Sequence, residues 1–140
     1  MAGFQLKKNL NEVEMREVRI SSQAYTDGDA VMTQTTADAI DVVPATSSAT
    51  VYTILGVAAE TVTSAATELL IRVLEPSQVW ECEVANTVTA NDQYQLMVLS
   101  DKDTVNNTHS TSAAKEAVFK QVGVLGAKGL FSPVLGGPVA

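Results

Sequence analysis

Residues branched at Cβ dominate this chain, since 38 of its 140 residues are Val, Thr or Ile. A branched Cβ restricts χ1 and is accommodated better on a pleated sheet than against the preceding turn of a helix. Short apolar runs also recur between Gly, Pro, Asn, Asp and Ser. The clearest runs are 39–43, 51–60, 68–74, 79–84, 94–100 and 117–126. This spacing predicts an all-β protein with a small sandwich or barrel-like domain.

The predicted domain spans residues 21–126 and lies between two terminal segments. Residues 1–20 are expected to form an N-terminal arm that leads into a first strand. Residues 126–140 contain four glycines and two prolines, which disfavour regular structure, together with several large apolar side chains. We therefore expect 127–140 to be a C-terminal arm that lies extended on its own domain or on a partner.

Two of the apolar runs lack a polar face. In 68–74 and 94–100, large apolar side chains occupy both alternating sets of positions. This pattern is expected of strands that are covered on both sides or packed at a subunit interface. It predicts a homotrimer, or at least a multimer whose contacts use these strands.

The run 79–84 alternates cleanly and predicts a half-buried strand. Trp80 and Cys82 share one face with Val84, so Cys82 is expected to be a buried, inert thiol. Glu81 and Glu83 share the other face, which we interpret as a solvated strand face and not as an acid/base pair.

The charge distribution limits the classes of partner. The formal net charge of −7 disfavours binding to nucleic acid or to an anionic membrane surface. Residues 21–105 carry twelve acidic and two basic side chains, so we expect this body to face outward and the terminal segments to face a partner. The flanking lysines are Lys7, Lys8, Lys115, Lys120 and Lys128. A single cysteine, with no signal-like or membrane-length apolar run, indicates a soluble protein that folds in a reducing compartment.

No catalytic constellation is recognisable. His109 is the only histidine and lies in a polar loop, where we expect a solvated side chain. One His and one Cys cannot supply the ligands of a usual zinc site, and no nucleotide-binding loop or nucleophile motif is present. We predict a protein that is not an enzyme and holds no cofactor or metal. Two acidic turns could in principle bind calcium through carboxylates alone, and the alternative is that their aspartates are ordinary turn residues. These turns are Asp27-Gly-Asp29 and Asp101-Lys-Asp103.

Part of the chain resembles the head-decoration (cement) proteins of tailed bacteriophages. The resemblance covers residues 24–85 and is one of pattern more than of identity. An apolar strand containing Ile54, Leu55, Val57, Ala58 and Ala59 is followed by a Thr/Ser-rich connection and then by further strands. The segments that carry it are Tyr25–Val31, Tyr52–Glu60, Thr61–Thr67, Glu75–Pro76 and Val79–Val84.

The resemblance implies a β-tulip-like domain in a non-enzymatic protein. Such proteins bind the outer capsid surface of the virion, usually as homotrimers that clamp the major capsid protein, and are assembled in the host cytoplasm. They commonly use a terminal arm for this contact, although the apolar tail of this chain has no counterpart in the family pattern. The expected partner-binding residues are Phe4, Leu6, Lys7, Lys8, Leu10, Leu130, Phe131, Val134 and Leu135.

Two other classes stay open. Another virion structural module, or a carbohydrate-binding or adhesive β-sandwich, fits the same composition, but sugar sites usually expose aromatic rings and only 5% of this chain is aromatic. A small hydrolase would require His109 to be catalytic.

Overall fold

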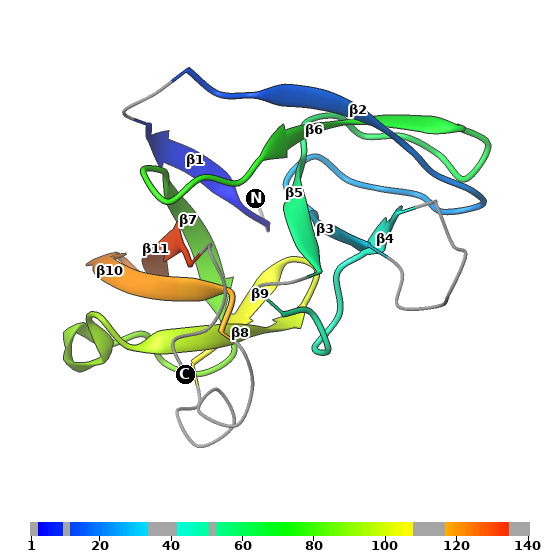
Figure 1. Cartoon of the computed structure of the whole chain (residues 1–140). Coiled ribbons are helices and arrows are strands. Elements are labelled where there is room, and N and C mark those ends of the chain that lie inside the picture. The colour runs from blue at the N-terminus through cyan, green and yellow to red at the C-terminus, as the bar shows by residue number, and fades with distance from the viewer. Residues whose placement is uncertain (1–2, 10–11, 34–41, 51–52, 108–116, 135–140) are drawn as a thin grey trace.

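Two β-sheets packed against each other make up the structure, which is a computed structural model (Figure 1). It describes residues 3–9, 12–33, 42–50, 53–107 and 117–134. The prediction of an all-β, sandwich-like fold is confirmed. Within the described residues the one helical element is a 3₁₀ turn, η1 (Ala90–Asp92), and no helix has the length and apolar character that crossing a membrane requires.

The first sheet has six strands in the order β1-β7-β11-β10-β8-β9, and β9 also pairs in parallel with β7. The second sheet has five antiparallel strands in the order β2-β6-β5-β3-β4. The first sheet contains β1 (Gln5–Lys8), β7 (Val79–Val84), β11 (Lys128–Pro133), β10 (Phe119–Leu125), β8 (Leu96–Asp101) and β9 (Thr104–Asn106). The second contains β2 (Met15–Arg19), β6 (Glu68–Val73), β5 (Ile54–Ala58), β3 (Ala30–Thr33) and β4 (Val42–Pro44).

The main core lies between the two sheets. Aromatic rings from the six-stranded sheet, Trp80, Phe119 and Phe131, pack with apolar side chains of β3 and β5. Phe4 also enters this core, stacked on Phe119 with ring centroids 4.9 Å apart. Because these rings come from both ends of the chain, the core joins its first and last described segments.

A second, smaller core covers the far face of the five-stranded sheet. Leu69 and Ile71 of β6 are buried there with Tyr25 and Ile20. The connection before β3 and the connection before β6 pair with each other, because the backbone N–H of Tyr25 donates to Val62 O (3.0 Å) and that of Val62 donates to Tyr25 O (2.9 Å). These loops therefore cover a face that would otherwise be exposed.

The two-sided apolar strands are covered within the chain itself. Met97, Val98 and Leu99 are consecutive in β8 and all fully buried, while Leu69 and Ile71 are buried in β6. These runs were expected either to be covered on both sides or to pack at a subunit interface. Burial within the domain accounts for most of their apolar side chains. The alternating strand 79–84 is β7, with Trp80 and Cys82 buried as predicted.

The expectation of a C-terminal arm without regular structure is wrong for residues 128–133. They form β11, which pairs with β7 on one side and β10 on the other. Gly129 serves close packing here, since a Cβ at this position would lie 2.5 Å from the Phe131 ring. Gly126 has φ +63° in the turn between β10 and β11, so both glycines suit a hairpin. Residues 135–140, including Leu135, lie outside the described residues.

The N-terminal segment is also part of the sandwich. Strand β1 pairs with β7, and the backbone N–H of Phe4 donates to Gly28 O (2.8 Å). The expected first strand is present as β2, but it belongs to the other sheet. The expectation that Phe4 belongs to a terminal arm is therefore wrong, because its ring is needed to fill the core.

Replacing Phe131 tests the role of the C-terminal strand in the core. Phe131→Ala removes a fully buried ring, and we expect it to lower the free energy of unfolding by about 3–5 kcal/mol. The neighbouring Leu130→Ala changes a half-buried side chain on the opposite face and should cost about 1 kcal/mol or less. Urea denaturation followed by Trp80 fluorescence measures both. Equal, small effects would show that β11 is not part of the folded core.

Candidate interaction surface

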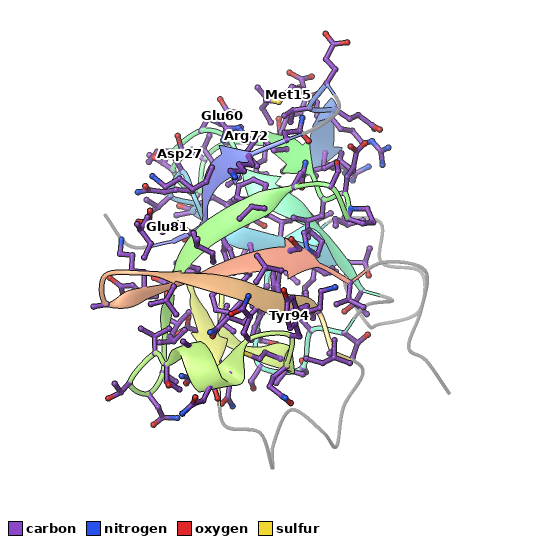
Figure 2. The ribbon with its side chains drawn as sticks, turned by 90° about the vertical axis from the view of Figure 1, so that its left-hand side faces the viewer. Met15, Asp27, Glu60, Arg72, Glu81 and Tyr94 are labelled. Carbon is purple, nitrogen blue, oxygen red and sulfur yellow. The ribbon has the colours of Figure 1, made fainter. Side chains whose placement is uncertain are left out.

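The outer face of the six-stranded sheet is the side turned away from the main core. Trp80 and Cys82 of β7 and Phe131 of β11 point into the core. Because side chains alternate along a strand, Glu81 and Leu130, which are paired with each other, point outward. Figure 2 looks onto this sheet and labels Glu81 and Tyr94.

One end of this face holds a charged cluster. The Glu81 carboxylate lies 3.1 Å from Lys7 Nζ of β1 and 3.4 Å from Lys128 Nζ of β11. The hydrogen bond from Lys7 lowers the pKa of Glu81 below its ordinary value, and Lys128 acts in the same direction against the opposing effect of burial. The interpretation of Glu81 as a solvated side chain is therefore wrong. Its ion pairs instead hold three neighbouring strands together.

The other end of this face is apolar and exposed. Leu96 lies opposite Lys120 of β10, with 48% of its surface exposed, and Tyr94 just before β8 is 68% exposed. Val124 and Leu125 are exposed as well, but they pair with Gly129 and Lys128 and so lie beside the charged cluster. Of the five large apolar side chains that are exposed in the described residues, two lie on β10 and two at or just before the start of β8. The fifth is Met15 on β2.

The backbone of Tyr94 is anchored by hydrogen bonds although its side chain is exposed. Its φ of +69° lies in the left-handed region, which a bulky side chain rarely adopts. The backbone compensates, since Tyr94 N–H donates to Gln121 O (2.6 Å) and Gln121 N–H donates to Gln95 O (3.1 Å). The buried Gln121 side chain also donates to Thr89 O (2.8 Å), next to η1. Backbone strain of this kind persists mainly where the surrounding structure enforces it, and it is often found at functional sites. The exposed ring of Tyr94 on this strained backbone therefore suggests a functional role.

The residues that were expected to bind a partner lie in different environments: some are in the core and others are at the surface. Phe4 and Phe131 are core residues, and Lys7 is paired with Glu81. Leu6 packs against the core, and Val134 is half-buried with its backbone N–H bonded to Val118 O (2.8 Å). Lys8 and Leu130 are the two that lie on β1 and β11 without entering the core, exposed and half-buried respectively. Leu10 lies outside the described residues, as does Leu135.

The two acidic turns adjoin each other. Lys102 Nζ lies 3.4 Å from Asp29 Oδ2, and Ala30 N–H donates to Lys102 O (2.7 Å). The pKa of Asp103 is raised because its carboxyl shares a hydrogen bond with that of Asp101. A lysine ammonium is thus the cation at this junction, and the described residues contain no group of three or more side chains suited to a metal.

His109 and Cys82 are the two residues that the sequence offered for catalysis. His109 lies outside the described residues. Cys82 is fully buried, its Sγ donates to Asp103 O (3.3 Å), and burial raises the pKa of its thiol. Within the described part of the chain, the arrangement on the outer face is suited to contact with another surface.

Comparison with known proteins adds no relative. No protein-family model matches the chain, and a search of curated proteins finds no match.

The contribution of Glu81 to stability should depend on pH. Its folded pKa is lowered, so its ion pairs stabilise the fold fully above the unfolded value of about 4.5 and lose this effect as the pH falls through the folded value. Wild type should exceed Glu81→Gln in stability near neutral pH, and the difference should shrink below pH 4.5. Urea midpoints measured from pH 7 to pH 3 check this, and a constant difference would contradict it.

Cys82 should be unreactive in the folded protein. Because the thiolate is the nucleophile and burial disfavours it, native protein should react with a thiol reagent only at the rate of unfolding. Stoichiometric labelling in urea is the positive control. Rapid labelling without denaturant would show that the β7 face is open.

Proposed function

We propose that this chain is a non-enzymatic structural protein that binds the outer surface of a tailed-bacteriophage capsid and stabilises it as a decoration or cement protein. Its partner is the major capsid protein, and it acts as a homotrimer on the virion after assembly in the host cytoplasm. The observation that carries the proposal is the exposed apolar end of the outer face, where Tyr94 and Leu96 stand on a backbone that is hydrogen-bonded to β10. Fixed apolar side chains surrounded by polar ones are typical of protein-binding surfaces.

The order of elements supports the phage assignment. The apolar segment on which the resemblance depends forms β5, and the Thr/Ser-rich stretch 61–67 connects it to β6 and then β7. This is the strand, connection and strand order of the family pattern. The described residues Ile54, Leu55 and Val57 lie in β5 and help to build the sandwich. The resemblance therefore supports the assignment of the fold, whereas the outer face supports the assignment of the contact surface.

The distribution of charge favours the same surface. Strands β1, β10 and β11 contain four of the nine basic residues of the chain, Lys7, Lys8, Lys120 and Lys128, and no acidic residue. The chain as a whole carries a charge of −7. Against these four lysines the same sheet carries the acidic residues Glu81, Glu83 and Asp101. The sheet is therefore slightly basic in an otherwise acidic protein, which favours its orientation towards an acidic partner surface. We therefore place the six-stranded sheet, and not a terminal arm, against the capsid.

A carbohydrate-binding module is the second candidate, and Tyr94 is the observation that favours it. An exposed ring can stack on a sugar. Trp80 and the other described aromatic side chains are buried, so Tyr94 would have to act alone among the described residues. Binding of the protein to a glycan array, with loss on Tyr94→Ala, would favour this candidate over the capsid.

Substitutions on the outer face test the capsid contact. Tyr94→Ala with Leu96→Ser should abolish or strongly reduce co-sedimentation with expanded capsids, because it removes the exposed apolar contact without changing the charge and leaves the core intact. Met15→Ser is the matched control, since Met15 is exposed (45%) but lies on the other sheet. Thermal melts establish that each variant is folded.

Undiminished binding of the double variant would contradict the assignment of this face. Absence of binding by wild type to any capsid would contradict the function itself. Light scattering at micromolar concentration tests the trimer, and a mass near 14.8 kDa would contradict it.

A further inference from the structure

Tyr94 stands at the third position of a type II β-turn. The turn comprises residues 92–95, and Gln95 N–H donates to Asp92 O (3.0 Å) to close it. Gln93 has φ −59° and ψ 133°, and Tyr94 has φ +69°. These angles match the second and third residues of a type II turn, whose third residue requires a positive φ. Glycine or asparagine is therefore the usual residue at the position where this chain has tyrosine.

A tyrosine in this conformation costs stability. The left-handed region brings Cβ close to the following carbonyl oxygen, which disfavours every residue other than glycine. Asparagine and aspartate offset part of this cost by local hydrogen bonds of their short side chains, which a phenol ring does not make. The ring gains little packing in return, since 68% of the Tyr94 surface is exposed. Nothing in the free protein therefore favours tyrosine over glycine at this turn.

Strand β10 holds the turn in place. Tyr94 N–H donates to Gln121 O (2.6 Å), and Gln93 Nε2 donates to Val122 O (3.4 Å). The buried Gln121 side chain also donates to Thr89 O (2.8 Å), on the far side of η1. A turn of another type would break these bonds. The positive φ is therefore enforced by the neighbouring strand, and the ring is attached to a backbone that is in place before any contact forms.

We propose that Tyr94 determines the specificity of the contact surface, and that its ring enters an apolar pocket of the partner that has an acidic side chain at its rim. This inference rests on the proposed function, because the partner is the one named there. A strained residue that packs little within its own protein is explained if its ring packs against another.

The acidic rim follows from the charge beside the turn. Lys120 of β10 stands opposite Leu96, so both side chains lie on the same face of the sheet. Strand β10 contains no acidic residue. A partner pocket that receives the neighbouring Tyr94 ring is thus approached by a lysine, which an acidic side chain complements.

Stability and binding should change in opposite directions at this position. A substitution that removes the ring together with Cβ relieves the turn, so it should stabilise the free protein and abolish the contact. A residue with a merely structural role would lower both quantities when replaced. The opposition therefore separates a role in binding from a role in folding.

Three substitutions of Tyr94 in the full-length chain separate the ring from the strain. Tyr94→Gly removes both, Tyr94→Ala removes the ring and keeps Cβ, and Tyr94→Phe keeps both. In urea denaturation, the glycine variant should have a folding equilibrium constant about fivefold above that of the alanine variant, and it should exceed wild type as well. In co-sedimentation with expanded capsids, the glycine and alanine variants should each bind more than about tenfold more weakly than wild type. The conservative variant Tyr94→Phe should lose no more than about threefold.

Replacement of Lys120 tests the acidic rim. Lys120→Gln should weaken capsid binding several-fold at low salt, and this difference from wild type should shrink as the salt concentration rises. Arg16→Gln is the control for net charge, since Arg16 lies on β2 of the other sheet. Equal effects of the two substitutions would overturn the acidic rim.

Two results at Tyr94 would overturn the proposal while wild type still binds and the proposed function stands. One is a glycine variant that is no more stable than the alanine variant, because the turn would then carry no strain. The other is a glycine variant that binds as tightly as wild type, because the ring would then make no contact. Failure of wild type itself to bind any capsid would instead refute the proposed function, and this inference with it.

Discussion

The packing of four aromatic rings between the sheets is the constraint on which the rest of this structure depends. Phe4 stacks on Phe119 at 4.9 Å and meets Trp80 edge-on at 6.5 Å, and Phe131 meets Phe119 at 6.3 Å. These distances lie in the range where aromatic pairs add to the gain from burial. The rings belong to the segment before β1 and to β7, β10 and β11, so one cluster sets the position of both chain ends. The Gln78 amide fixes Trp80 by accepting from its Nε1 (2.9 Å).

The outer face follows from this core. With Trp80, Cys82 and Phe131 directed inward, alternation leaves Glu81 and Leu130 outside, and the two lysines beside Glu81 hold β1 and β11 against β7. The apolar end has a different origin, because Tyr94, just before β8, and Leu96, its first residue, are exposed before the buried stretch starts at Met97. We propose that this preformed sheet face is the one that contacts a partner. Its binding would not require a terminal segment to fold on contact.

The sequence was sufficient to predict the sheet class and the clean alternation of β7, because β-branched composition and period-two patterning are local properties. It did not predict β11. The glycines and prolines of 126–140 indicate a break in regular structure when read alone, and only the position of Gly129 against the Phe131 ring shows why glycine is needed. The same limit applies to Glu81, whose partners Lys7 and Lys128 are distant in the sequence. Tyr94 and Leu96 occupy the same alternating set of positions as the buried Val98. Alternation along the strand therefore cannot predict that the first two are exposed while Val98 is buried.

Amide hydrogen exchange of the free and capsid-bound protein tests most directly whether a preformed sheet face, and not a terminal arm, makes the contact. If the face is preformed, the amides of β1 and β11 exchange as slowly in the free protein as those of β7. Capsid binding should then add protection around residues 93–96 and 120–122. Fast exchange of β11 in the free protein that becomes slow only on the capsid would contradict it.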